Sequence, residues 1–310
     1  MTPLPMREGA LLVAALIDLY MAHYAGRDTT RVQRLSWWRE RLGTLTLQDV
    51  TDDHVHEAME ELAQQPARHF MGLDAANKPI FKAKREPLRP ATLNRYSAAI
   101  AAVFTWAIKR RITPKGWMHP CRGIEVRVEN NGKVRFLSQD ERERLLAACK
   151  GSAWPKLYLL VLAALTTGAR RGELLGLRWR DIDFAHSVAH IGRSKNNDPK
   201  VLPLVPAVIG ELRGHQAGGD ELVFASSRLP SAPFSFQAQW VAALKVARLR
   251  SFTFHDLRHS CASYLAQNGA TLLEIGDLLG HRSLVVTKRY AHLCAAHRTA
   301  LVNRVLGDLR

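Results

Sequence analysis

Residues 252–293 decide the fold of the second half of the chain, and they read FTFHDLRHSCASYLAQNGATLLEIGDLLGHRSLVVTKRYAHL. His255 and Arg258 are three residues apart, so on a helix their side chains lie on one face. An apolar stripe follows at helical spacing, and the Asn268-Gly269 pair is typical of a helix end. The stretch therefore predicts a helix that carries two polar side chains near its start.

A second helix is predicted over residues 272–279, because Gly280 follows its last apolar residue. This helix places His281 just beyond its C-terminus, and Tyr290 follows one short helical turn later. Two helix ends and a turn can thus direct His255, Arg258, His281 and Tyr290 at one spot. Three of these side chains can carry or share positive charge, and the fourth is a phenol. Such a set suits an anionic substrate and an oxygen nucleophile.

Residues 165–179, LTTGARRGELLGLRW, supply a further charged group. Gly168 interrupts a long apolar helix, and Arg170 stands at the start of a new one. Glu173 follows one turn later, and the leucines after it face inward. The pattern predicts a buried helix followed by a short helix that presents an arginine at its beginning.

These stretches resemble the tyrosine recombinases of the phage integrase family. TGARRGELLGLRW resembles the first arginine box of the family, and HDLRHSCASYL resembles its His-x-x-Arg box. LGHRSLVVTKRYAHL resembles the box that ends in the nucleophilic tyrosine. The resemblance covers about residues 8–300. It implies a mainly α fold with a small antiparallel β-sheet (α+β), built from a helical core-binding domain and a tyrosine-recombinase catalytic domain.

The resemblance also implies the reaction. Tyr290 would attack a DNA phosphodiester, leaving a 3′-phosphotyrosine and a free 5′-hydroxyl, and the 5′-hydroxyl of another strand would reverse the step. The covalent intermediate stores the bond energy, so no nucleotide cofactor is expected, and fixed positive charge removes the need for a metal. The implied catalytic residues are Arg170, Lys195, His255, Arg258, His281 and the nucleophile Tyr290, with Glu173 orienting Arg170 or the tyrosine region.

The implied roles follow from side-chain chemistry. Arg170 and Arg258 would each fork onto the non-bridging phosphate oxygens, a geometry that lysine cannot copy. His281 would add a donor to the same oxygens, and His255 would act near the Tyr290 proton. Because a free phenol has a pKa of about 10, the nearby cations are expected to help ionise Tyr290.

Two assignments leave alternatives open. The resemblance makes Lys195 the general acid that protonates the 5′-oxygen, but Lys200 lies on the same predicted hairpin. His255 and His259 stand at a zinc-ligand spacing, yet an arginine lies between them and no H-E-x-x-H glutamate is present, which argues against a metal. We therefore expect His259, like His292, to be a packed, hydrogen-bonded histidine.

Composition points to a polyanionic partner. The 310 residues suffice for two domains, and 44 Lys and Arg against 28 Asp and Glu give a formal charge of +16. No apolar run approaches the ~20 residues that span a bilayer. The four cysteines form no C-x-x-C pair, which is typical of a reducing cytoplasm. We expect double-stranded DNA as partner, no membrane, and a cytoplasmic, nucleoid-associated protein.

The front of the chain predicts four helices, which resemble the core-binding domain of the family. They cover about residues 8–24, 30–43, 49–65 and 90–111. A basic insertion at about 70–90 separates the last two, and residues 70–73 and 79–82 predict a short hairpin within it. We predict contacts to the DNA backbone there, and the alternative is a surface insertion that makes none. The candidate DNA-binding residues are Lys82, Lys84, Arg85, Arg89 and Arg95.

The predicted domains are residues 1–120 and 137–310, joined by a linker at 121–136. A capping box, Ser138 with Glu141, opens the second domain. Short strands are predicted at about 181–184, 187–191 and 201–204, and further helices at about 156–167, 207–215, 236–247 and 295–309.

The last helix has an apolar stripe made of Leu301, Val302, Val305 and Leu306. We hypothesise that it docks on a neighbouring protomer, and the alternative is that it folds back on its own domain. Because the core-binding pattern begins by residue 10, we expect no additional N-terminal domain for outlying arm sites.

Together these patterns predict a site-specific DNA recombinase that integrates or excises a mobile element. Its working form would be a homotetramer on two DNA sites, with accessory DNA-bending proteins as further partners. A Xer-like resolvase and a transposon recombinase are close alternatives. More distant ones are a type IB topoisomerase, which uses the same tyrosine chemistry on one strand, and a DNA-binding regulator that has lost catalysis.

Overall fold

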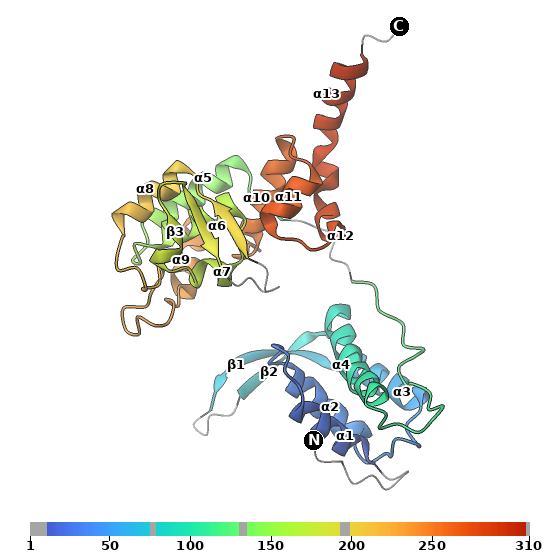
Figure 1. The fold of residues 1–310 in the computed structure, drawn as a ribbon. Coiled ribbons are helices and arrows are strands. Elements are labelled where there is room, and N and C mark those ends of the chain that lie inside the picture. Colours follow the sequence, from blue (N-terminus) through green and yellow to red (C-terminus); the bar gives the residue numbers. More distant parts are fainter. Residues whose placement is uncertain (1–10, 75–78, 130–134, 193–198, 308–310) are drawn as a thin grey trace. The chain divides into compact units, whose positions relative to one another are not determined.

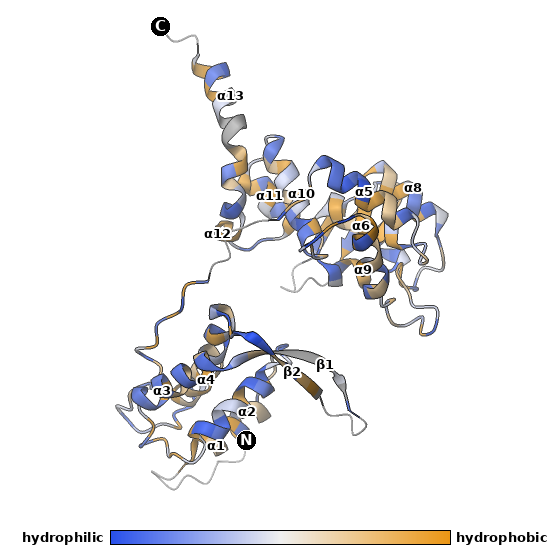
Figure 2. Cartoon of the chain, turned by 180° about the vertical axis from the view of Figure 1, so that it is seen from behind, coloured by the Kyte–Doolittle hydropathy of each residue, from blue (hydrophilic) through white to orange (hydrophobic). Residues whose placement is uncertain are grey.

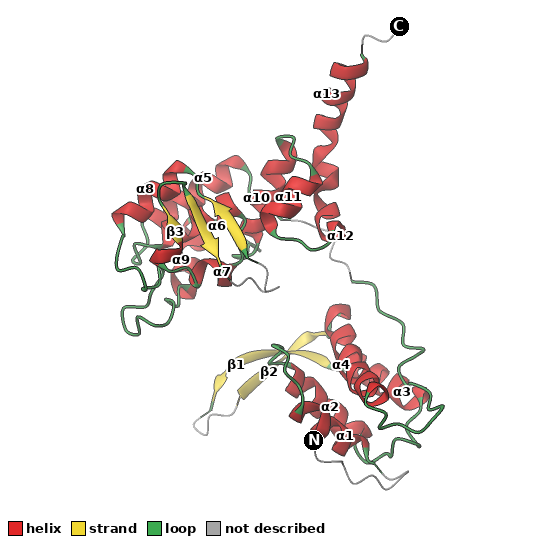
Figure 3. Ribbon diagram, in the orientation of Figure 1, coloured by secondary structure: helices red, strands yellow, loops and turns green. Residues whose placement is uncertain are grey.

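The computed structural model describes residues 11–74, 79–129, 135–192 and 199–307 (Figure 1). The chain divides into two compact units, residues 1–130 and 131–310, each with its own hydrophobic core. The division falls within the range 121–136 that the sequence suggests as a linker. Mainly helical structure with small antiparallel sheets confirms the predicted fold class (Figure 3).

The first unit is a helical domain with a hairpin. Its helices are α1 (Val13–Ala22), α2 (Arg31–Leu42), α3 (Asp52–Gln64) and α4 (Pro90–Lys109). Thr51 caps α3 by accepting from the backbone N–H of His54, and Pro90 begins α4 at a position where no N–H is needed. Trp38 and Phe104 are fully buried in its core, and the neighbouring Trp37 is partly buried against it.

The hairpin is longer than its sequence pattern predicts. Strand β1 (Pro66–Leu73) pairs antiparallel with β2 (Pro79–Pro87), and Phe70 lies opposite Phe81. The register shifts twice along the ladder, which interrupts the alternation of side chains that sequence analysis depends on. Residues 74–78, which join the two predicted strands, lie mostly outside the described residues.

The second unit begins at the predicted capping box, where Ser138 accepts from the backbone N–H of Glu141. Its elements up to the sheet are α5 (Gln139–Lys150), α6 (Leu157–Thr167), α7 (Arg171–Leu175), the 3₁₀ turn η1 (Trp179–Asp181), β3 (Ile182–Asp183), β4 (Val188–Ile191) and β5 (Lys200–Pro203). The three strands form an antiparallel sheet in the order β3-β4-β5, with Ala189 paired to both Ile182 and Leu202.

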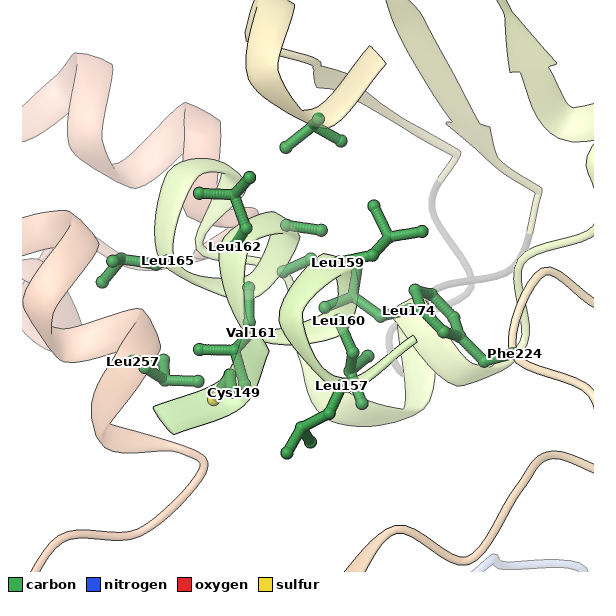
Figure 4. Packing of buried hydrophobic residues seen from close by; sticks show 14 of the residues in the cluster. Cys149, Leu157, Leu159, Leu160, Val161, Leu162, Leu165, Leu174, Phe224 and Leu257 are labelled. Carbon is green, nitrogen blue, oxygen red and sulfur yellow. The ribbon is translucent and has the colours of Figure 1, made fainter. Parts of the chain in front are cut away.

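The remaining elements are helical: α8 (Pro206–Gly214), α9 (Gln237–Val246), α10 (Asp256–Gln267), α11 (Leu272–Leu279), α12 (Leu284–Thr287), η2 (Lys288–Cys294) and α13 (Ala295–Leu306). Helix α6 is hydrophobic along its length (Figure 2) and is buried on nearly every side. Leu257 of α10 and Cys149 of α5 lie close to it in the core (Figure 4). Because α6 is held so firmly, the turn that follows it is well placed to position a functional group.

Two glycines shape the turns that lead to the polar cluster. Gly168 ends α6 with φ = 61°, and Gly280 ends α11 with φ = 67°, a left-handed conformation that favours glycine. A Cβ on Gly168 would lie 2.4 Å from Cδ2 of Leu279, so the ends of the two helices approach closely only because this residue is glycine.

Helix α13 carries apolar side chains that are exposed. Val302, Val305 and Leu306 are all more than half exposed. The fourth member of the predicted stripe, Leu301, has a side chain outside the described set, so docking in trans stays a prediction.

Among the described residues, no helix is both long and apolar enough to cross a membrane. The four cysteines are free thiols.

Candidate active site

Arg170 immediately precedes α7, where Glu173 holds both its backbone and its side chain. The backbone N–H of Arg170 donates to Oε2 of Glu173 at 2.9 Å, and Nη1 donates to Oε1 at 2.8 Å. Burial alone would raise the pKa of Glu173, but the hydrogen bonds from Arg170 and the charges of Lys200 and Arg170 outweigh it and lower the pKa. The carboxylate is therefore ionised and holds Arg170 by two hydrogen bonds, one from its backbone N–H and one from its guanidinium.

Arg258 is almost fully buried and is fixed by two backbone carbonyls. Nη1 donates to the oxygen of Gly168 at 2.7 Å, and Nη2 donates to the oxygen of Leu279 at 2.8 Å. Both acceptors belong to the turns that the left-handed glycines form, so Arg258 links the end of α6 to the end of α11. Burial, followed by the charge of Arg170, lowers the pKa of Arg258 to about 10, and it stays protonated at neutral pH.

Lys200 is the first residue of β5 and lies beside the same carboxylate. Its Nζ is 3.9 Å from Oε2 of Glu173, and it is buried without a hydrogen-bond partner among the described residues. Burial lowers the pKa of Lys200 to about 8, although the charge of Glu173 opposes that shift. The other candidate, Lys195, lies outside the described residues, so the choice between the two lysines stays a prediction.

His281 follows Gly280, and its ring is oriented by a buried hydroxyl. Nδ1 lies 2.8 Å from Oγ1 of Thr287, whose side chain is fully buried. Burial, followed by the charges of Arg258 and Arg170, lowers the pKa of His281 to about 4. The imidazole is therefore neutral at pH 7, and if the threonine hydroxyl donates to Nδ1, Nε2 carries a hydrogen that can be donated to an anion.

Tyr290 lies in η2, and its hydroxyl meets a histidine other than the one predicted. Nδ1 of His259 is 2.6 Å from the Tyr290 oxygen. The resemblance had placed His255 near this proton. His255 instead stands before α10, with its ring centroid 5.0 Å from that of His259. His259 was expected to be a packed, hydrogen-bonded histidine, and it is half-buried and makes this bond. The same expectation for His292 is wrong, because its side chain is exposed.

The ionisation of Tyr290 also differs from expectation. The phenol side chain is almost completely buried, and burial raises its pKa. The charges of Arg289 and Arg258 oppose that rise but do not offset it. In the free chain the phenol therefore stays protonated despite the nearby cations, and its proton has to be removed during strand cleavage.

A single cavity of about 470 Å³ collects these groups. Its lining includes five of the six predicted catalytic residues, Arg170, His255, Arg258, His281 and Tyr290, together with His259, Arg282 and Arg289. His259, Arg282 and Arg289 were not predicted from the sequence as members of the site. The only signal for His259 was its helical spacing from His255, which had suggested a zinc pair.

The described residues contain no group of three or more His, Cys, Asp or Glu side chains that could hold a metal ion. Positive charge in the cavity comes from arginine side chains, with Lys200 close by.

The candidate DNA-binding residues lie in the first unit. Lys82, Lys84 and Arg85 are exposed on β2, Arg89 precedes α4, and Arg95 is exposed on α4 itself. These positions leave all five side chains accessible to a polyanion, and their contacts with DNA stay a prediction.

Known proteins are similar to this chain along most of its length. The phage integrase family model matches residues 135–297. The integrase of Salmonella phage P22 is 27% identical over 301 residues, which cover 90% of this chain and 74% of that protein.

Two solved structures share the fold. One is the Tn1549 transposon integrase in complex with a circular intermediate DNA, with a TM-score of 0.70 and 17% identity, covering 94% of this chain and 100% of that one. The other is a lambda integrase tetramer bound to a Holliday junction, with a TM-score of 0.63 and 19% identity, covering 88% of this chain and 78% of that one.

Proposed function

This chain belongs to the phage integrase family, and from that premise we propose that it is a site-specific DNA recombinase that cuts and rejoins strands through a 3′-phosphotyrosine. The observation that carries the proposal is the cavity in which Tyr290 lies with Arg170, Arg258 and His281. Each of the three companions can bind a non-bridging phosphate oxygen. Two hydroxyls line the cavity, those of Tyr290 and Ser283, and the phenol is the one that the family resemblance assigns as nucleophile.

The cavity suits an anionic transition state. Attack by the tyrosine oxygen would build negative charge on the non-bridging oxygens, and Arg170 and Arg258 are already held in place by Glu173 and by backbone carbonyls. Preorganised donors of this kind stabilise developing charge without reorganising during the reaction. His281, neutral and anchored by Thr287, would add an N–H donor.

The leaving 5′-oxygen would take its proton from a lysine. Family resemblance favours Lys195, and the burial of Lys200 beside Glu173 makes it the alternative. An ammonium with a pKa of about 8 is a suitable proton donor near neutral pH. A bridging 5′-phosphorothiolate substrate separates the two, because its sulfur leaves without protonation and restores cleavage only to the variant that lacks the general acid.

The proposed substrate is double-stranded DNA at a junction between a mobile element and its host. The P22 relative is the integrase of a phage and supports this role, and a XerC recombinase that is also 27% identical keeps a Xer-like resolvase as the alternative. The lambda integrase tetramer on a Holliday junction supports a homotetramer acting on two sites. We also propose that accessory DNA-bending proteins assist the reaction and that the protein associates with the nucleoid.

Covalent trapping tests the proposal. Wild-type protein and Tyr290→Phe are incubated, without metal or ATP, with nicked duplexes drawn from the DNA that surrounds the gene. Denaturing electrophoresis should reveal a protein–DNA adduct with wild type alone. A duplex that both proteins bind but that neither captures would contradict the recombinase function and favour a binding-only regulator. Exchange between two marked duplexes would separate recombination from topoisomerase activity.

A further inference from the structure

His255, which the resemblance places near the Tyr290 proton, does not make the hydrogen bond to the tyrosine hydroxyl that the structure shows, and a half-buried contact with another histidine takes that position. Nδ1 of His259 lies 2.6 Å from the tyrosine oxygen, and the two rings are 6.0 Å apart between centroids. His259 is the fourth residue of α10, and Tyr290 lies in η2, which packs on that helix. The contact therefore depends on the tertiary packing of two elements.

The protonation of the pair determines the direction of this hydrogen bond. Burial, followed by the charges of His255 and Arg289, lowers the pKa of His259 to about 4. Burial raises the pKa of Tyr290. At pH 7 the imidazole is neutral and the phenol holds its hydrogen, so the hydroxyl donates and Nδ1 accepts. The imidazole hydrogen is then on Nε2.

The charged groups around this pair come from both elements. Helix α10 and the residue before it contribute Asp256, Arg258 and His255, and η2 contributes Arg289. Asp256 alone among these favours a protonated His259, while the other three oppose it. The unprotonated Nδ1 of His259 therefore faces the protonated hydroxyl of Tyr290. Both groups line the cavity that also contains Arg170 and Arg258.

We propose that His259 is the general base that takes the proton of Tyr290 during strand cleavage, an inference that rests on the proposed recombinase function. As the bond from the tyrosine oxygen to phosphorus forms, the tyrosine O–H bond breaks and the proton moves to Nδ1. The bond from phosphorus to the 5′-oxygen breaks, and that oxygen takes a proton from the active-site lysine. Rejoining reverses each transfer, with His259 returning its proton to the departing tyrosine.

The low basicity of His259 is compatible with this role. A phenolic proton becomes far more acidic once its oxygen begins to bond to phosphorus, so the transfer becomes favourable within the step rather than before it. The arriving phosphodiester also brings negative charge into a cavity whose cations disfavour an imidazolium. His255, which lines the same cavity, is left free to contact the phosphate.

Two substitutions separate proton transfer from positioning. In His259→Asn, the amide oxygen can occupy the place of Nδ1 and accept the same hydrogen bond, but it cannot take up a proton. In His259→Phe, both the bond and the base are lost. His292→Asn is the control, because His292 is exposed and only two residues from Tyr290.

The measurement is the single-turnover rate of adduct formation on the nicked duplex that the wild-type protein captures, with folding and DNA affinity checked beforehand. We expect the rate of adduct formation to fall by about 100-fold or more in both His259 variants, which is the lower end of typical general-base effects. The control variant should react at the wild-type rate. The loss should persist on a 5′-phosphorothiolate duplex, because a sulfur leaving group does not replace a base acting on the nucleophile.

His259→Asn cleaving at close to the wild-type rate would overturn the proposal, even if His259→Phe were slow, because a positioning role would then suffice. Restoration of His259→Asn by the phosphorothiolate would also overturn it, since that result assigns His259 to the leaving group. The absence of any Tyr290-dependent adduct with wild type is a different outcome, and it would reject the recombinase function itself.

Discussion

Replacing Lys200 with methionine should stabilise the protein. The ammonium of Lys200 is buried without a hydrogen-bond partner among the described residues and lies beside two arginines and one carboxylate. Methionine keeps a similar unbranched stem and removes the charge. The buried charge of Lys200 therefore lowers the stability of the folded chain, a cost that is common near active sites.

The magnitude follows from the pKa of the lysine. Burial lowers that pKa from 10.5 to about 8, and one pKa unit corresponds to about 1.4 kcal/mol. The charged side chain therefore costs about 3 kcal/mol in the folded state, a net value that already includes its attraction to Glu173. In a unit of this size, that corresponds to an increase in melting temperature of about 6–12 °C for Lys200→Met.

The pH dependence has a defined sign. Below pH 8 the lysine is protonated in both the folded and the unfolded chain, so the full cost is present. Between about 8 and 10.5 the unfolded chain binds more protons, so the free energy of unfolding of the wild type rises with pH relative to that of the variant. The advantage of Lys200→Met is therefore largest near neutrality and disappears toward pH 10.5.

Scanning calorimetry at pH 7 and pH 10 measures both effects. Lys245→Met, at an exposed position on α9, is the matched control and should change little. A Lys200→Met protein that melts at or below the wild-type temperature at pH 7 would refute the reasoning, because the ammonium would then be favourably held by its surroundings.

Other predictions address the turns, the hairpin and the last helix. Gly168→Ala should lower the free energy of unfolding by about 2–4 kcal/mol in urea titrations, because the new Cβ meets a left-handed φ and clashes with Leu279. The control Gly172→Ala places its Cβ in open space and should not lower it. Equal stabilities of the two variants would contradict this prediction. Neutralising Lys82, Lys84 and Arg85 should lower the salt slope of DNA binding by up to about one unit per lost phosphate contact, and an unchanged slope would exclude the hairpin contact. Deleting residues 296–310 should abolish synapsis but spare DNA binding in gel-shift assays, and normal synapsis would show that α13 does not dock in trans.

Local patterns predicted much of the fold because local chemistry determined it. Helix α11 ends where Gly280 indicates, and α5 begins at the capping box of Ser138 and Glu141. Helix α4 begins at the proline that favours a first helical turn. The hairpin was underestimated because its bulges break the alternation by which strands are recognised. The 3₁₀ conformation of η2 has no comparable signal in the sequence.

Contacts between site residues that are close in the sequence were predictable from helical spacing. Contacts that depend on the packing of distant elements were not. Arg170 and Glu173 are one turn apart, so their pairing follows from helical spacing. His259 and Tyr290 are 31 residues apart, and their contact exists only because η2 lies against α10. The burial of Lys200 likewise depends on where β5 meets the end of α11.

The most direct test of the central claim is the identity of the amino acid that joins DNA. The covalent adduct can be digested with trypsin and nuclease, and the modified peptide sequenced by mass spectrometry. Cleavage after Arg289 and Arg298 predicts the peptide YAHLCAAHR, carrying a 3′-phosphonucleotide on Tyr290. A nucleotide attached to any other residue, or joined through a 5′-phosphate, would contradict the account of this cavity as the site of strand cleavage.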